Sequence, residues 1–267
     1  FASELGALSA WPDWDQTVDE TALVNYLQFG YSAPPSTIMM GAAQVLPGHT
    51  LRIEGVGDDQ WTQIRYFDCN APGAPGTSFR SLIESAVERQ LVSDVPLGVF
   101  LSGGIDSSII AACARRHGRI STFSIGFDDP RYDETPFARE VAKRLDTVHH
   151  EFRVTPDAAA DLPKLAEVYG EPFGDSSALP THYLSRETRK HITVALSGDG
   201  GDELFGGYDR YRAMAMNIAP LRPLAGLGKW LARGHPKSRL TRAGRLLASA
   251  SLGEAARYEQ YVSIFDK

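Results

Sequence analysis

The stretch Val99-Phe100-Leu101-Ser102-Gly103-Gly104-Ile105-Asp106-Ser107-Ser108 decides how the fold of this chain is interpreted. Its apolar start predicts a buried strand, and the apolar residues 109–114 predict a helix, so two glycines stand at a strand-to-helix turn. Such a turn presents free backbone N–H groups at the positive end of a helix dipole, which favours phosphate or pyrophosphate. The three serine hydroxyls can donate to the same oxygens.

Asp106 gives this turn a second property, because a carboxylate repels a bare phosphate. A divalent cation removes that conflict by bridging the carboxylate and the phosphate, since hard cations prefer oxygen ligands. The sequence therefore predicts a phosphate site with a metal ligand at Asp106. The alternative is an ordinary strand-to-helix turn with a serine cap and no ligand.

A second glycine-rich turn carries similar features. Leu196 ends another apolar run, and Ser197-Gly198-Asp199-Gly200-Gly201-Asp202-Glu203-Leu204-Phe205-Gly206-Gly207-Tyr208 follows. Three carboxylates so close together repel one another unless cations neutralise them. If the strands are parallel, this turn lies at the same edge of the sheet as the first, and we expect Asp202 to share a magnesium site with Asp106. The alternative is an acidic, glycine-rich loop without a ligand.

Size and composition exclude several classes of protein. The 267 residues, with a net charge of −6, suit one large domain or a small and a medium one. We find neither an apolar run near the roughly 20 residues that cross a bilayer nor a signal pattern. The two cysteines, Cys69 and Cys113, predict neither a disulfide framework nor a zinc site. We expect a cytoplasmic protein that binds no membrane and no nucleic acid.

The order of predicted elements indicates an α/β fold. Before residue 70 we expect a helix at 20–29 and a hairpin of strands at 50–54 and 61–67, joined by the turn at 55–59. Residues 70–77, rich in proline and glycine, predict a linker. After it, strands alternate with helices, which predicts a doubly wound, mostly parallel sheet. The predicted strands are 97–101, 121–127, 148–154 and 192–196. The predicted helices are 79–91, capped by Ser78, then 107–116, 134–145, 157–169 and 181–190. From about residue 213 the pattern is helical, with breaks at 220–223 and 234–236.

Taken together, these segments resemble the synthetase domain of the glutamine-dependent asparagine synthetases, which belong to the ATP pyrophosphatase (PP-loop) superfamily. The resemblance rests on residues 95–108, 123–127, 147–151, 171–181 and 196–208. Residues 1–8 and 46–49 resemble the end of the family's glutaminase domain. The resemblance implies a sheet of the adenine nucleotide α-hydrolase type. It also implies three parts: the remnant of an Ntn-type glutamine amidotransferase domain at 1–69, the linker at 70–77, and a synthetase domain at 78–267.

The resemblance also implies a two-step reaction. ATP adenylates a carboxylate, in asparagine synthetases the side chain of aspartate, and pyrophosphate leaves. Ammonia derived from glutamine then attacks, giving the amide and AMP. By motif position, Asp199 helps ammonia lose its proton, and Mg²⁺ falls on Asp106 and Asp202. The residues that fall on ATP are Phe100, Ser102, Gly103, Gly104, Asp106, Ser107, Ser108, Ile125, Ser197 and Gly198.

Two departures from the family pattern leave alternatives open. Better-known asparagine synthetases have Glu at the position of Asp199, and a related bacterial subgroup with Asp includes enzymes for other carboxylates, such as cell-wall precursors. A β-lactam-forming relative is a further alternative. Neither Cys69 nor Cys113 stands where the family has its N-terminal nucleophile. We therefore expect a segment cut at both ends, and a nucleotide-binding fragment without turnover stays open, as does a homodimer of the intact protein.

Some single residues have two interpretations. His149 and His150 lie on a predicted strand and are expected to be packed rather than to bind metal. Glu171, Asp175 and Ser176 lie in a loop on the same side as both glycine turns, where they either line the amino-acid pocket or are ordinary polar loop residues. Arg210 follows the second turn and is a candidate contact for phosphate or carboxylate.

Overall fold

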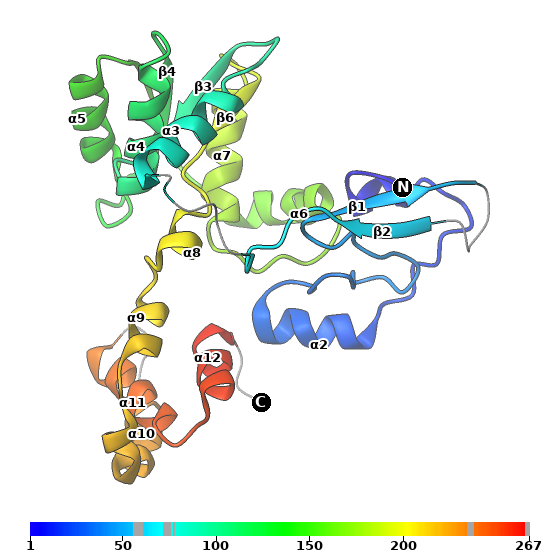
Figure 1. The fold of residues 1–267 in the computed structure, drawn as a ribbon, viewed down its shortest axis with the longest axis vertical. Coiled ribbons are helices and arrows are strands. Elements are labelled where there is room, and N and C mark those ends of the chain that lie inside the picture. Colours follow the sequence, from blue (N-terminus) through cyan, green and yellow to red (C-terminus); the bar gives the residue numbers. More distant parts are fainter. Residues whose placement is uncertain (56–60, 72–75, 77, 234–237, 265–267) are drawn as a thin grey trace. The chain divides into compact units, whose positions relative to one another are not determined.

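The chain forms two compact units in the computed structural model, which describes residues 1–55, 61–71, 76, 78–233 and 238–264. Unit 1 comprises Phe1–Tyr26 and Tyr31–Asp199, and unit 2 comprises Leu27–Gly30 and Gly200–Lys267. The alternating strands and helices lie in unit 1, and the helical C-terminal portion lies in unit 2 (Figure 1).

The first part of the chain contains the predicted helix and hairpin. A short helix, α1 (Leu5–Leu8), precedes α2 (Glu20–Phe29). The carboxylate of Asp19 accepts hydrogen bonds from the backbone N–H groups of Thr21 and Ala22 at 2.8 and 3.1 Å, which explains why α2 starts where it does. Strands β1 (His49–Ile53) and β2 (Trp61–Arg65) pair antiparallel. The predicted hairpin turn at 55–59 and the linker at 70–77 fall mostly outside the described residues.

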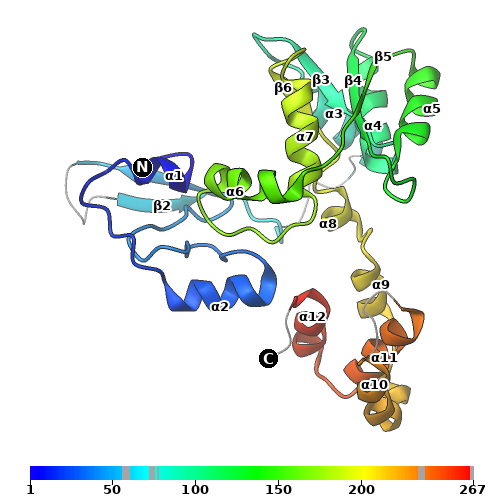
Figure 2. The same cartoon turned by 180° about the vertical axis from the view of Figure 1, so that it is seen from behind.

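Unit 1 is built on a four-stranded parallel sheet, which confirms the predicted fold class. Its strands are β3 (Leu97–Phe100), β4 (Ser121–Gly126), β5 (Val148–Arg153) and β6 (Val194–Leu196). Their order across the sheet is β5-β4-β3-β6 (Figure 2), and each neighbouring pair is parallel. The first strand of this sheet in sequence, β3, therefore lies between β4 and β6. The turns that follow β3 and β6 leave the same edge of the sheet.

Helices pack on both faces of this sheet. They are α3 (Phe79–Gln90), α4 (Ile105–Arg115), α5 (Thr135–Leu145) and α7 (Ala178–Thr188), whereas α6 (Ala158–Tyr169) packs against α7 and α1. On one face, Val99 of β3 is buried with residues of α3, α4 and α5, including Val87, Ala111 and Ala138. On the other face, the ring of Phe123 stacks on His150 with 5.0 Å between the ring centroids. Helix α7 packs against β4 (Figure 2).

Two helices begin earlier than the sequence predicts. Helix α4 begins at Ile105 rather than at residue 107, because Gly104 adopts an extended conformation (φ −68°, ψ 167°) and serves as the N-cap. Helix α7 begins at Ala178 rather than at residue 181, with Pro180 in its first turn, where a missing N–H costs no helical hydrogen bond. The predicted cap of α3 is confirmed, because the Ser78 hydroxyl accepts from the N–H of Ser81 at 3.1 Å.

Unit 2 is helical throughout its described part. Its elements are α8 (Gly201–Phe205), α9 (Asp209–Ala215), the 3₁₀ helix η1 (Ala219–Leu224), α10 (Ala225–Leu231), α11 (Arg239–Ser249) and α12 (Glu254–Val262). Glycines allow α10 and α11 to pack closely, since a Cβ on Gly228 would lie 2.3 Å from the backbone nitrogen of Ala248. The predicted break at 234–236 falls outside the described residues. No helix of the described ranges is both long and apolar enough to cross a membrane.

The half-buried His149 is expected to make the stability of the fold depend on pH. Its ring nitrogens lie 2.9 Å from the Thr122 hydroxyl and 3.3 Å from the Ser124 hydroxyl. Burial lowers the pKa of His149 below 6.5, although Glu151 opposes this shift. A histidine with a lowered pKa in the folded state contributes stability that is complete above its unfolded pKa and is lost as the pH falls from that value through the folded pKa.

We therefore predict that the free energy of unfolding decreases as the pH is lowered from 7.5 to 5.5, and that His149→Gln makes this decrease smaller. Urea unfolding at both pH values measures the effect. His117→Gln is the matched control, because His117 is exposed and its replacement should leave the pH dependence unchanged. An unchanged pH dependence in His149→Gln would show that His149 does not contribute to it.

Candidate functional site

The turn after β3 folds back tightly on the start of α5. Gly103 has a φ of +83°, a region that favours glycine. A Cβ at this position would lie 2.6 Å from the backbone nitrogen of Ala138 and from the carbonyl carbon of Phe137. Glycine at 103 is thus required both by the backbone conformation and by the packing, and it fixes the path of the chain into α4.

Serine hydroxyls close this turn from inside. The hydroxyls of Ser102 and Ser107 lie 2.9 Å apart, and the Ser107 hydroxyl accepts from the N–H of Ser102 at 3.2 Å. The N–H of Gly104 donates to the Ser102 hydroxyl at 3.2 Å. Ser107 is buried, so its hydroxyl is engaged within the turn in this structure, whereas the sequence suggested that all three hydroxyls face phosphate oxygens.

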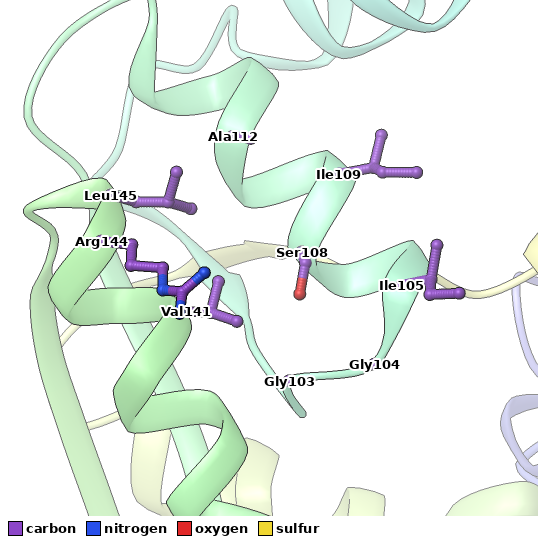
Figure 3. A pocket seen from close by; sticks show the side chains of 9 residues that line it. All are labelled: Gly103, Gly104, Ile105, Ser108, Ile109, Ala112, Val141, Arg144 and Leu145. Atoms are coloured by element: carbon purple, nitrogen blue, oxygen red, sulfur yellow. The ribbon is translucent and has the colours of Figure 1, made fainter.

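Ser108 faces a pocket between α4 and α5 instead. The pocket has a volume of about 430 Å³ and is open to solvent on one side. Figure 3 shows the side chains of Ser108, Val141 and Arg144 pointing into the space between the two helices. The residues that line it are Gly103, Gly104, Ile105, Ser108, Ile109, Ala112, Val141, Arg144 and Leu145. Three of the predicted ATP contacts, Gly103, Gly104 and Ser108, therefore share one cavity with a cation from α5.

The second glycine-rich turn begins beside the first, because β6 pairs in parallel with β3. Leu196 is the partner of Val99 in this register. Beyond it, the backbone of Gly198 lies against the first turn of α4. A Cβ on Gly198 would be 2.7 Å from the backbone nitrogen of Ser107 and 3.0 Å from the Cβ of Asp106. The expectation that residues 197–199 reach the same edge as the first turn is thus confirmed.

The remaining predicted nucleotide contacts of unit 1 lie at this same edge. Phe100 is the last residue of β3, and Ile125 is the next-to-last residue of β4; both are half-buried. The hydroxyl of Ser197 donates to the carboxylate of Asp199 at 2.9 Å. Asp199 itself is exposed, so its carboxylate is held from one side and is accessible from the other.

The second and third acids of this turn lie in the first turn of α8, in unit 2. The carboxylate of Glu203 accepts a hydrogen bond from the Tyr208 hydroxyl at 2.7 Å. This bond lowers the pKa of Glu203 and raises the pKa of Tyr208 to about 12. The guanidinium carbon of Arg210 lies 3.8 Å from the centroid of the Tyr208 ring. Arg210 therefore stacks on an aromatic ring here, and its contact with phosphate or carboxylate stays a prediction.

The predicted magnesium ligands belong to different units, Asp106 to unit 1 and Asp202 to unit 2. Their pairing therefore stays a prediction. Among the residues that the structure describes, there is no group of three or more His, Cys, Asp or Glu side chains suited to hold a metal ion. The residue type of each fits this ion, since Mg²⁺ is usually held by one or two carboxylates plus phosphates and water.

The acidic loop between α6 and α7 makes contacts within the protein. A carboxylate oxygen of Glu171 accepts from the backbone N–H of Ile38 at 3.1 Å, and Asp175 accepts from the N–H of Ser177 at 2.8 Å. Glu171 thus joins the loop to the N-terminal part of unit 1. Both carboxylates retain free lone pairs, and their role as a pocket for an amino acid stays a prediction.

Some residues of the site carry no signal in the sequence pattern. Val141 and Arg144 lie within an amphipathic helix, where their types are unremarkable, and they join the pocket only because Gly103 draws the first turn against α5. Gly207 is also a residue of the site, since a Cβ there would lie 1.8 Å from a carboxylate oxygen of Asp202. Unlike the two helix residues, Gly207 has a signal in the sequence, because it stands in a glycine pair.

Comparisons with known proteins agree with these motifs. The profile of the family described as Asparagine synthase matches residues 78–265. Glutamine-hydrolyzing asparagine synthetase 1 of Bacillus subtilis is 36% identical over 240 residues, which cover 86% of this chain and 37% of that protein. Asparagine synthetase 3 of the same organism is 33% identical over 241 residues, covering 78% of this chain and 37% of that protein. The chain thus spans little more than a third of the length of these relatives.

Further similarities come from a plant protein and from solved structures. The asparagine synthetase of Zea mays is 34% identical over 179 residues, covering 61% of this chain and 30% of that protein. The NMN synthetase of Francisella tularensis superposes with a TM-score of 0.36 at 15% identity, covering 68% of this chain and 89% of that one. A glutamine-dependent NAD⁺ synthetase of Acinetobacter baumannii gives a TM-score of 0.33 at 17% identity, covering 73% and 48%.

The close approach of the two turns predicts the effect of a single methyl group. Gly198→Ala places a Cβ against the backbone of α4, which has little freedom to move, so we expect the free energy of unfolding to fall by about 1–3 kcal/mol. Urea unfolding measures this loss. Gly226→Ala is the control, because a Cβ there meets no atom within 4 Å; we expect it to be neutral or slightly stabilising. Equal stability of both variants would contradict the close packing of the turns.

Proposed function

The chain belongs to the asparagine synthase family, and we propose that it carries the ATP-dependent step of amide formation. The observation that supports this most is the packing of Gly198 against the first turn of α4. It gathers two strand-end turns, with backbone N–H groups, hydroxyls and carboxylates, at one edge of a parallel sheet. Open α/β sheets bind ligands beyond the carboxyl ends of their strands.

In the first step, an oxygen of the substrate carboxylate attacks the α-phosphorus of ATP, and the bond from that phosphorus to the pyrophosphate oxygen breaks. The backbone N–H groups at the start of α4 and the Ser108 hydroxyl would hold the phosphates. Phe100 and Ile125 would contact the base, together with the backbone at Ser197 and Gly198. Mg²⁺, held by Asp106 and Asp202, would supply positive charge where the leaving pyrophosphate is most negative.

In the second step, ammonia attacks the carbonyl carbon of the acyl-adenylate, and the bond from that carbon to the AMP oxygen breaks. The attacking nitrogen must lose a proton, and Asp199 is the residue that we assign to accept it. The hydrogen bond from Ser197 fixes the direction of this carboxylate. The other face of the carboxylate is exposed and therefore accessible to the nitrogen.

We further propose aspartate as the carboxylate substrate and glutamine as the source of ammonia in the intact protein. The names of the Bacillus relatives support both assignments. In this proposal, residues 1–69 are the end of a glutaminase domain and residues 78–267 form the synthetase domain. Because Asp199 is one methylene shorter than the Glu of better-known members, another carboxylate, such as a cell-wall precursor, is the second candidate substrate.

Release of pyrophosphate from ATP, measured with Mg²⁺ and ammonia, tests the proposed reaction. We expect aspartate to stimulate release and asparagine to form in equal amount. If only a different carboxylate stimulates release, that carboxylate is the substrate and the assignment of aspartate is wrong. Where every carboxylate fails but Mg²⁺–ATP still raises the melting temperature, the chain is a nucleotide-binding fragment and the proposed turnover is wrong.

Two substitutions separate binding from chemistry. Asp106→Ala should abolish Mg²⁺-dependent binding of ATP, because it removes a metal ligand beside the phosphates. Asp199→Ala should leave ATP affinity within about twofold and reduce amide formation by 10²-fold or more, which is typical of losing a general base. Isothermal titration with ATP and the amide assay measure the two effects. Asp94→Ala, an exposed acid just before β3, should behave as the wild type in both. ATP binding unchanged in Asp106→Ala would remove the metal assignment.

A further inference from the structure

Helix α8, which carries Asp202, is too short to be rigid by itself. It has five residues, from Gly201 to Phe205, and glycines in the left-handed region stand at both ends, Gly200 with φ +88° and Gly206 with φ +68°. The N–H of Leu204 donates to the carbonyl of Gly200 at 3.0 Å. Isolated helices of this length are marginal in water, because the first turn costs more entropy than its hydrogen bond returns. Something outside the helix must therefore hold it.

The chain that leaves α8 folds back over Asp202. The N–H of Gly207 donates to the carbonyl of Asp202 at 3.0 Å. A Cβ on Gly207 would lie 1.8 Å from an oxygen of the Asp202 carboxylate. The position of residues 206 and 207 therefore limits the directions that this carboxylate can take.

Tyr208, the next residue, holds this folded-back segment in place. Its hydroxyl donates to the carboxylate of Glu203 at 2.7 Å, which ties the exit of the turn to the residue beside Asp202. The same bond distinguishes the two neighbouring acids, because the carboxylate of Glu203 already accepts a hydrogen bond from Tyr208. Asp202 is the acid that remains for a cation.

Tyr208 is itself anchored in unit 2. It is the N-cap residue of α9, and Arg210 of that helix stacks over its ring. The ring of Tyr211 lies 5.7 Å from the Tyr208 ring and 6.4 Å from the ring of Tyr258 on α12. The phenol thus connects the short helix α8 to a group of packed aromatic rings. These rings give α8 the support that it does not have by itself.

We propose that Tyr208 is a positioning residue for the reaction: its hydrogen bond to Glu203 holds α8 in one conformation and so presents the Asp202 carboxylate to Mg²⁺. The role of Asp202 as a metal ligand rests on the proposed function. The bracing of α8 is a property of this chain alone, and it can be measured without any ligand.

The first test is hydrogen exchange of the unliganded chain. Tyr208→Phe removes one hydroxyl and keeps the ring, so we expect amide exchange within residues 201–207 to speed up about threefold to tenfold, the range that one hydrogen bond contributes. Tyr211→Phe is the matched control, since it removes a hydroxyl from the same aromatic group without touching Glu203. Glu203→Gln keeps an oxygen that can accept the bond and should exchange nearly as the wild type does.

The second test is the magnesium dependence of ATP binding, measured by titration at several Mg²⁺ concentrations. We expect Tyr208→Phe to raise the Mg²⁺ concentration for half-maximal binding by about threefold to tenfold, with Tyr211→Phe unchanged. A wild type without Mg²⁺-dependent ATP binding would contradict the proposed function, while hydrogen exchange would still decide the bracing. Exchange in Tyr208→Phe equal to the wild type, or an equal effect of Tyr211→Phe, would overturn the inference.

Discussion

The close contact between Gly198 and the first turn of α4 is the constraint on which the rest of the site depends. It follows from the parallel pairing of β6 with β3, which delivers two glycine-rich turns to one edge of the sheet. A larger residue at 198 would separate them, because the atoms that it meets are backbone atoms of Ser107 and Asp106 and the Cβ of Asp106. Without this contact, the phosphate turn and the carboxylate that we assign to proton transfer would be separate features of the sequence.

The acids of the second turn show how neighbouring carboxylates acquire different environments. Asp199 is oriented by the Ser197 hydroxyl, and Glu203 is occupied by the Tyr208 phenol. Asp202 is confined by the backbone of Gly207 rather than by a donor side chain. Three carboxylates within five residues thus have different surroundings, because local hydrogen bonds and the glycines that let the chain turn place each one differently. We propose that this division leaves one acid for the metal and one for the proton.

Much of unit 1 could be predicted from the sequence, because buried parallel strands and amphipathic helices have different periods. The alternation of strands and helices predicts the parallel sheet and the meeting of the two turns at one edge. The serine before the helix at 79–91 predicts the cap at Ser78. The inward hydroxyl of Ser107 could not be predicted, since a serine satisfies a ligand or its own turn with the same donor. The hydrogen bond between Tyr208 and Glu203 could not be predicted either, because it depends on the left-handed glycine at 206 that reverses the chain between them.

We propose that both turns contact one nucleotide. Selective labelling of glycine with ¹⁵N allows the amides of Gly103, Gly104 and Gly198 to be followed by NMR while Mg²⁺–ATP is added. We expect the signals of all three to shift along one binding curve, while the signal of Gly226 in α10 does not. Shifts at Gly103 and Gly104 with none at Gly198 would contradict it, because the second turn would then lie outside the site.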